Sequence, residues 1–294
     1  AELLRMSDIA LYQAKAAGRN TWRFYAEGMN AHLLARRQLE QELRFALADD
    51  QLRVHYQPRY ATLTGSLRSF EALVRWQHPE RGLLPPDTFI PLAEETGLIQ
   101  PLGRWVLEHA CRQAMAWPSD IGLSVNLSPG QLAENEDIVA VVANALHSSG
   151  LPANRLELEI TERVLLDHAH SALKTLTALR ALGVRLSLDD FGTGFSSLAY
   201  LRKYPLDGIK IDRSFIAHLT ERGNDQAIVQ AMIDLGRSLG MTVTAEGVET
   251  LEQLECLQRH PCDEVQGFHF SKAVPAEKLG PLFASSVAGE SGPV

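Results

Sequence analysis

Short alternating runs of apolar and polar residues are separated by longer segments in which leucines recur at helical spacing. From Gln51 onward, the short runs have the period of two that is typical of β-strands, and the segments between them have the 3.6-residue period of amphipathic helices. The pattern predicts eight strands, over residues 52–57, 70–76, 122–127, 156–160, 184–188, 208–211, 242–245 and 264–268. Strands and helices alternating in this way predict an α/β fold, a TIM-like (β/α)8 barrel over residues 49–285, with a doubly wound open sheet as the alternative.

The connection between the first two predicted strands is too short for a helix. Residues 62–66 are a small polar segment containing Gly65. Parallel neighbours need a long crossover, whereas antiparallel neighbours can be joined by a hairpin. The barrel is therefore expected to be irregular at its start, with an antiparallel first strand.

The remaining segments lie outside the predicted barrel. Residues 26–48 place leucines on a helical period and predict a connecting helix. Residues 1–25 predict a helix, a glycine turn and a short strand, which are too short to bury their own core and suggest the remnant of an upstream domain. Residues 286–294 are rich in Gly, Ser and Pro and predict a flexible tail.

Composition narrows the class of protein. The net charge of −8 argues against a surface for extended nucleic acid. No apolar run reaches the ~18 residues that span a bilayer, so no membrane contact is expected from this chain. The three cysteines, Cys111, Cys256 and Cys262, have no tight ligand spacing, which favours a reduced, cytoplasmic chain.

Several predicted strands carry charged side chains on the face that should point into the barrel. In residues 156–160 the apolar side chains share one face, and Glu157 and Glu159 share the other. Lys210 and Asp212 lie opposite the isoleucines of their strand in the same way. Carboxylates gathered in a barrel interior repel one another and lose hydration, and a divalent cation is the usual compensation.

Taken singly, each polar residue has an ordinary explanation: a solvated loop glutamate, a surface lysine, or Asp189 and Asp190 as a helix N-cap. Their repetition at successive strands favours a shared site instead, because TIM-type barrels place their chemistry at the carboxyl ends of the strands. Oxygen ligands suit Mg²⁺ or Mn²⁺. The candidate ligands are Glu71, Asn126, Glu159, Asp189, Asp190 and Glu246. His168 and His170 are interpreted as solvated helix residues.

A series of short motifs follows these positions along the chain: Tyr56-Gln57-Pro58, Glu71-Ala72-Leu73, Val74-Arg75-Trp76, Asn126-Leu127-Ser128, Glu159-Ile160-Thr161-Glu162, Asp189-Asp190-Phe191-Gly192, Lys210-Ile211-Asp212, Ala245-Glu246-Gly247-Val248-Glu249 and Gln266-Gly267-Phe268. In this order, over about residues 38–283, they resemble the EAL family of cyclic di-GMP (c-di-GMP) phosphodiesterases. Residues 1–25 resemble the end of a GGDEF domain. The GGDEF motif itself is absent, so no cyclase activity is expected.

The resemblance implies hydrolysis of c-di-GMP to linear 5′-pGpG by a water activated by two Mg²⁺ or Mn²⁺ ions. Glu71, Asn126, Glu159 and Asp189 are implied as ligands of one ion, and Asp190 and Glu246 as neighbours of the second. The implied catalytic residues are Lys210, Glu246 and Glu162. The implied substrate contacts are Gln57, Leu73, Arg75, Asp212, Glu249 and Gln266, with Arg75 as a phosphate clamp on the same strand face as Glu71.

The resemblance also implies a homodimer through the region after Asp190, with Glu162 holding that loop. Two alternatives stay open: a receptor that binds c-di-GMP without cleaving it, and a barrel enzyme of another chemistry with Lys210 as base. The sequence departs from the family pattern at Arg59-Tyr60-Ala61, where two apolar residues and an Asp are common.

Overall fold

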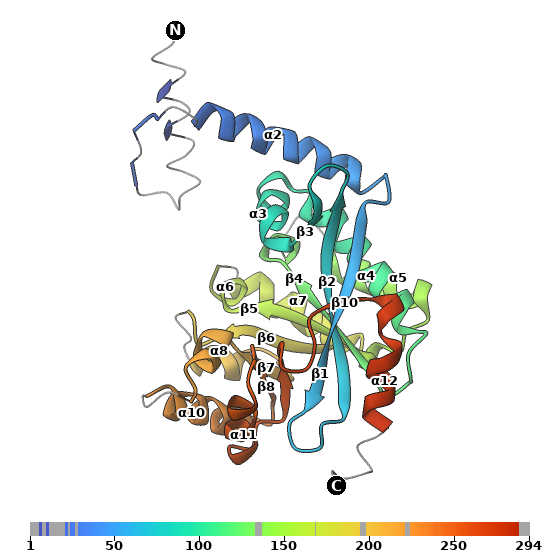
Figure 1. Ribbon diagram of the computed structural model, residues 1–294, viewed down its shortest axis with the longest axis vertical. Coiled ribbons are helices and arrows are strands. Elements are labelled where there is room, and N and C mark those ends of the chain that lie inside the picture. The colour runs from blue at the N-terminus through green and yellow to red at the C-terminus, as the bar shows by residue number, and fades with distance from the viewer. Residues whose placement is uncertain are drawn as a thin grey trace.

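The computed structural model describes residues 6, 7, 10, 11, 21, 22, 24–26, 29–132, 137–167, 169–194, 198–220 and 224–287. Its centre is a closed barrel (Figure 1), which confirms the predicted fold class. The barrel closes because the first strand pairs with both the second and the last. Its strands are β1 (Leu52–Ala61), β2 (Leu67–His78), β4 (Gly122–Leu127), β5 (Leu156–Thr161), β6 (Arg185–Phe191), β7 (Gly208–Ile211), β8 (Thr242–Glu246) and β9 (Glu264–Gln266).

Strand β1 runs antiparallel to both of its neighbours, β2 and β9, whereas the pairs from β2 through β9 are parallel. The hairpin predicted at the start of the barrel is therefore confirmed. Two further short strands, β3 (Gly82–Leu84) and β10 (Val274–Pro275), extend the sheet beyond the barrel and are too short to show a sequence period.

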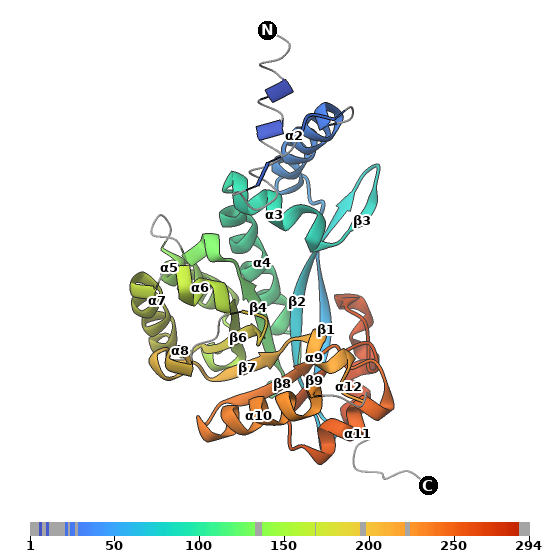
Figure 2. The ribbon, with the colours of Figure 1, turned by 90° about the vertical axis from the view of Figure 1, so that its left-hand side faces the viewer.

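Helices cover the outside of the barrel (Figure 2). They are α3 (Pro86–Thr96), α4 (Ile99–Ala114), α5 (Ile138–Ser149), α6 (Glu162–Asp167), α7 (Ala169–Ala181), α8 (Leu198–Lys203), α9 (Arg213–Ala217), α10 (Asp225–Ser238), α11 (Leu251–Arg259) and α12 (Gly280–Val287), with 3-10 turns at Pro129–Leu132, Ala153–Arg155 and Ala276–Lys278. None of the described helices combines the length and the hydropathy that crossing a bilayer requires.

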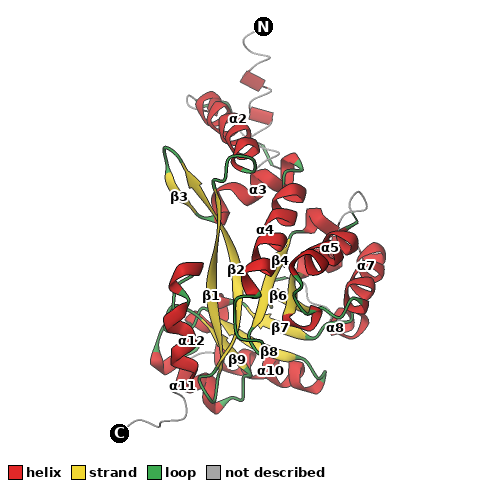
Figure 3. Cartoon of the chain, turned by 90° about the vertical axis from the view of Figure 1, so that its right-hand side faces the viewer, coloured by secondary structure: helices red, strands yellow, loops and turns green. Residues whose placement is uncertain are grey.

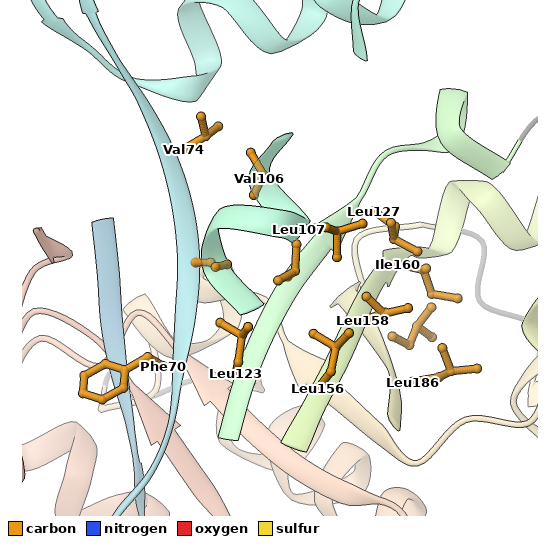
Figure 4. Packing of buried hydrophobic residues seen from close by; sticks show 14 of the residues in the cluster. Phe70, Val74, Val106, Leu107, Leu123, Leu127, Leu156, Leu158, Ile160 and Leu186 are labelled. Atoms are coloured by element: carbon orange, nitrogen blue, oxygen red, sulfur yellow. The ribbon is translucent and has the colours of Figure 1, made fainter. Parts of the chain in front are cut away.

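The main core lies between the outer faces of the strands and these helices. Leu123, Leu156, Leu158 and Leu186 are fully buried and face this layer, and Leu107 of α4 packs toward it (Figure 4). Since strand side chains alternate, filling the outer layer with leucines turns the residues between them toward the barrel axis. The arrangement puts the predicted polar residues inside the barrel.

Helix α2 (Met29–Ala46) stands beyond one end of the barrel (Figure 3), where a connecting helix was predicted. It buries Leu39 and Leu43, and its Glu42 accepts a hydrogen bond from His78 of β2 at 3.1 Å. The proposed domain boundaries remain predictions, because most of residues 1–25 and residues 288–294 lie outside the described residues.

Several predicted element boundaries differ from those of the structure, most clearly near the C-terminal end of the barrel. Helix α12 continues to Val287, so the first two residues of the predicted tail are helical; the helix is anchored by Leu282 and Phe283, which pack against the core. The last strand ends at Gln266 rather than Phe268. At this end of the strand the Gln266 carbonyl accepts from the Val248 amide at 3.0 Å, and the backbone of Gly267 lies close to that of Val248.

Candidate active site

Lys210 of β7 lies at the centre of the charged interior and is 1% exposed. Its ammonium nitrogen is 2.6 Å from Glu159 Oε2 and 2.6 Å from Glu246 Oε1. Asp189 Oδ1 is at 3.3 Å and Glu71 Oε2 is at 3.7 Å. One buried cation is thus surrounded by four carboxylates that come from four different strands.

Strand register explains why residues far apart in sequence meet at this level. Gln57 of β1 pairs with Glu71 of β2, Asn126 of β4 pairs with Glu159 of β5, and Glu246 of β8 pairs with Gln266 of β9. Each pair brings two polar side chains to neighbouring positions. The registers therefore form a ring of polar residues around Lys210.

Amide side chains fix the carboxylate of Glu71. Asn126 Nδ2 donates to Glu71 Oε1 at 2.7 Å, and Gln266 Nε2 donates to Glu71 Oε2 at 2.6 Å. Gln57 Oε1 lies 3.2 Å from Gln266 Nε2, and Gln57 Nε2 donates to the Ser271 carbonyl at 3.1 Å. Both oxygens of Glu71 are consequently held in defined directions.

Asp189 and Asp190 both reach the mouth of the barrel although they are consecutive in β6. Consecutive strand residues normally point to opposite faces. Here the β6–β7 register shifts between Leu188 and Phe191, and Asp190 adopts φ 55°, the left-handed conformation that Asp tolerates better than most residues. Oxygens of Asp189, Asp190 and Glu246 all lie within 4.8 Å of one another, which is close enough to share a metal ion.

The cluster is short of positive charge. Burial is the main cause that raises the pKa of Glu71 and of Asp189, and it raises the pKa of Glu246 to about 8. Burial also acts to raise the pKa of Glu159, but Lys210 and Arg59 outweigh it and lower that pKa. Three of the four carboxyls around Lys210 therefore resist ionisation.

These residues fit a divalent cation. Asp189 Oδ1 is buried and accepts no hydrogen bond, although Lys210 lies 3.3 Å away. The donors are carboxylate and amide oxygens, the ligands that Mg²⁺ and Mn²⁺ prefer. A bound divalent ion would supply the charge that lets these carboxyls ionise.

A cavity of about 270 Å³ opens directly above Lys210. It is lined by Gln57, Glu71, Leu73, Asn126, Asp189, Lys210, Arg213, Glu246, Gly247, Glu249, Gln266, Gly267 and Phe268. Sequence reasoning missed Arg213 and Phe268. Arg213 lies two residues after the end of β7, at the barrel end that carries the chemistry, and that position was an available signal.

The EAL domain profile matches residues 40–273. The chain belongs to the EAL domain family.

Relatives of this EAL domain include two curated proteins of Pseudomonas aeruginosa. The bifunctional diguanylate cyclase/cyclic di-GMP phosphodiesterase MucR is 45% identical over 282 residues, which are 95% of this chain and 41% of MucR. The cyclic di-GMP phosphodiesterase NbdA is 45% identical over 282 residues, which are 95% of this chain and 36% of NbdA. The chain thus spans well under half the length of these relatives.

A solved structure resembles the EAL domain closely. The PaMucR phosphodiesterase in complex with c-di-GMP has a TM-score of 0.79 and 46% sequence identity, and the match covers 82% of this chain and 99% of that one. The comparison shows the same barrel architecture.

Five residues predicted for the EAL site do not line the 270 Å³ cavity: Arg75, Glu159, Glu162, Asp190 and Asp212. Arg75 donates to the neighbouring Val74 carbonyl at 2.9 Å and does not line the cavity. Asp212 caps helix α9 by accepting from the Ser214 amide at 3.0 Å. Asp190 lines an adjoining cavity of about 400 Å³, which shares Leu73, Asn126 and Asp189 with the first.

Glu162 lies beneath the loop that follows β6. Its Oε1 accepts from the Gly192 amide at 2.8 Å, and a Cβ on Gly194 would lie 2.4 Å from its Oε2. The carboxylate therefore holds this loop closely. The predicted dimer contact through the loop stays a prediction, because residues 195–197 lie outside the described residues, as does His168.

Proposed function

We propose that this EAL domain hydrolyses c-di-GMP to linear 5′-pGpG with the help of divalent metal ions. The observation that carries the proposal is the buried ammonium of Lys210 among four carboxylates beneath a cavity. The family, the phosphodiesterase names of MucR and NbdA, and the c-di-GMP complex of PaMucR support the same substrate.

We assign two groups of ligands for two ions. Glu71, Asn126, Glu159 and Asp189 would hold one ion. Asp189 would be shared with a second ion, near Asp190 and Glu246. When bound, Mg²⁺ or Mn²⁺ ions supply an acidified water and compensation for phosphate charge. The raised pKa values of Glu71, Asp189 and Glu246 support this assignment, since burial outweighs the attraction of Lys210 at each of these carboxyls.

Lys210 would orient the attacking water and stabilise charge on the phosphate. Glu159 and Glu246 each hold its ammonium at 2.6 Å, so its position is fixed before substrate binds. The water oxygen forms a bond to one phosphorus, and the bond from that phosphorus to the 3′-oxygen breaks. The ring then opens, and the 3′-oxygen takes up a proton.

The cavity wall would bind the dinucleotide. Gln57, Leu73, Glu249 and Gln266 line it and are placed to contact substrate. Arg213 adds a cation at the rim, and Phe268, which is 57% exposed, offers a face for a base. Asp212 and Arg75 stay assigned to substrate contacts as predictions, and Arg75 would need to turn away from the Val74 carbonyl to reach a phosphate.

Chromatography of c-di-GMP incubated with the purified chain tests the proposal. We expect conversion to 5′-pGpG with Mg²⁺ or Mn²⁺ and no conversion with EDTA. Binding of c-di-GMP without conversion under any metal condition would favour the receptor alternative. If the chain neither binds nor converts c-di-GMP, the assignment of substrate is overturned.

A further inference from the structure

Arg59 of β1 is a buried cation beneath the active site and is 3% exposed. Its Nη1 lies 2.7 Å from Glu157 Oε1 and 3.4 Å from Glu264 Oε2. Its Nη2 lies 2.5 Å from Glu159 Oε1 and donates to Ser124 Oγ at 3.0 Å. One guanidinium therefore ties together side chains from β4, β5 and β9.

Arg59 and Lys210 share the carboxylate of Glu159 between them. The guanidinium of Arg59 donates to Oε1 from below, and the ammonium of Lys210 donates to Oε2 from above at 2.6 Å. Because both oxygens are held by cations, the plane of the carboxylate is fixed. A carboxylate fixed in this way presents Oε2 toward the mouth of the barrel, where Lys210 and Asp189 lie.

Arg59 also separates two cavities. A cavity of about 470 Å³ opens at the amino ends of the strands and is lined by Arg59, Arg68, Glu157 and Glu264, among others. Among the described residues, none lines both this cavity and the 270 Å³ cavity above Lys210. Arg59 thus lines the lower cavity, and Glu159, which lines neither cavity, connects it to Lys210 in the lining of the active-site cavity.

We propose that Arg59 is a positioning residue that holds Glu159 for metal binding. The inference rests on the proposed metal centre. Groups that orient a ligating carboxylate typically change metal affinity about 10- to 100-fold when removed. A lysine at this position keeps the charge but lacks the planar fork that reaches Glu157, Glu159 and Ser124 together.

A positioning role and a simple charge effect predict opposite signs. As a nearby positive charge alone, Arg59 repels a metal cation, so its removal would tighten metal binding. As the group that orients Glu159, its loss weakens binding. Arg59→Lys distinguishes the positioning role from the charge effect further, because a pure charge effect predicts unchanged metal affinity for this variant.

Mn²⁺ titration of the full chain, followed by electron paramagnetic resonance, measures the affinity without relying on turnover. We expect Arg59→Met and Arg59→Lys each to weaken Mn²⁺ binding by about 10- to 100-fold. Arg68→Met is the matched control, because Arg68 lines the same lower cavity and is exposed. The Arg68→Met variant should bind Mn²⁺ with unchanged or slightly higher affinity.

A double-mutant cycle shows whether Arg59 acts through Glu159. In a Glu159→Gln background, Arg59→Lys should add little further loss of Mn²⁺ affinity, because contacting residues that act as a unit are non-additive. Circular dichroism and thermal unfolding check the fold, and Arg59→Lys decides the question if Arg59→Met does not fold. Wild-type Mn²⁺ affinity in Arg59→Lys, or tighter Mn²⁺ binding in Arg59→Met, overturns the role of Arg59 but not the proposed metal centre. Absence of Mn²⁺ binding by the wild type overturns the proposed metal centre as well.

Discussion

Gly267 provides a quantitative test of how closely two segments of the active site are packed. A Cβ built on Gly267 would lie 2.0 Å from the carbonyl oxygen of Val248 and 2.3 Å from its nitrogen. Both are backbone atoms, so no side-chain rotation relieves the overlap. In Gly267→Ala, one of the two segments has to move.

The required movement is about 1 Å, since real Cβ atoms essentially never approach another heavy atom closer than 3.0 Å. The Val248 amide donates to the Gln266 carbonyl at 3.0 Å, and the His269 amide donates to the Val248 carbonyl at 3.0 Å. These bonds join the segments that carry Glu249 and Gln266, two residues of the cavity wall. A misplacement of about 1 Å in a catalytic site costs on the order of 100-fold in rate.

We expect Gly267→Ala to lower the rate of c-di-GMP hydrolysis about 100-fold. Overpacking should also cost about 1–3 kcal/mol of stability, measured by thermal or denaturant unfolding. Gly280→Ala is the matched control, because no atom lies within 4 Å of its Cβ position. If folded Gly267→Ala hydrolyses c-di-GMP at a rate within about threefold of wild type, the packing argument is refuted.

Three further predictions concern the acidic residues. Glu71→Ala should abolish hydrolysis, because Glu71 joins Asn126 and Gln266 to the cluster; near-normal turnover by a correctly folded variant in the chromatographic assay would contradict this. Glu162→Ala leaves the Gly192 amide without its carboxylate acceptor, a loss of about 1.5–3 kcal/mol, and should weaken both Mg²⁺ affinity and activity; an unchanged Mg²⁺ dependence would argue against it. Burial raises the pKa of Glu246 from 4.5 to about 8. Protonated Glu246 therefore contributes stability below pH 4.5 that is lost as the pH rises through about 8. The melting temperature of EDTA-treated protein should fall over this range, Mg²⁺ should reduce the fall, and Glu246→Gln without metal should show less of it.

The alternation of apolar and polar residues predicted the barrel because one face of every strand must meet the helices. In Leu156–Thr161, the leucines fill the outer layer, and Glu157 and Glu159 necessarily face inward. The same alternation predicted that Lys210 points into the barrel. Local periodicity is sufficient for these positions, since burial acts on each strand separately.

Other features depend on geometry that spacing does not encode. Arg75 was predicted to clamp a phosphate from the same strand face as Glu71. Four residues of strand span about 13 Å, and in the structure its guanidinium donates to the Val74 carbonyl, so the clamp stays a prediction. Asp190 reaches the site through a register shift and a left-handed backbone. Arg59 was visible in the sequence only as a departure from the family pattern, because its carboxylate partners lie on strands 98 to 205 residues away.

The reversed direction of β1 gives the cavity two kinds of wall. Gln57 and Glu71 lie in the middle of long strands, and hydrogen-bonded neighbours continue on both sides of them. Asp189 and Glu246 line the same cavity near or at the ends of their strands, close to where loops begin. Loops open at lower free energy than paired strands do. The hairpin side of the cavity should therefore act as a fixed template against which a ligand is aligned, and adjustment to different ligands should be confined to the opposite side.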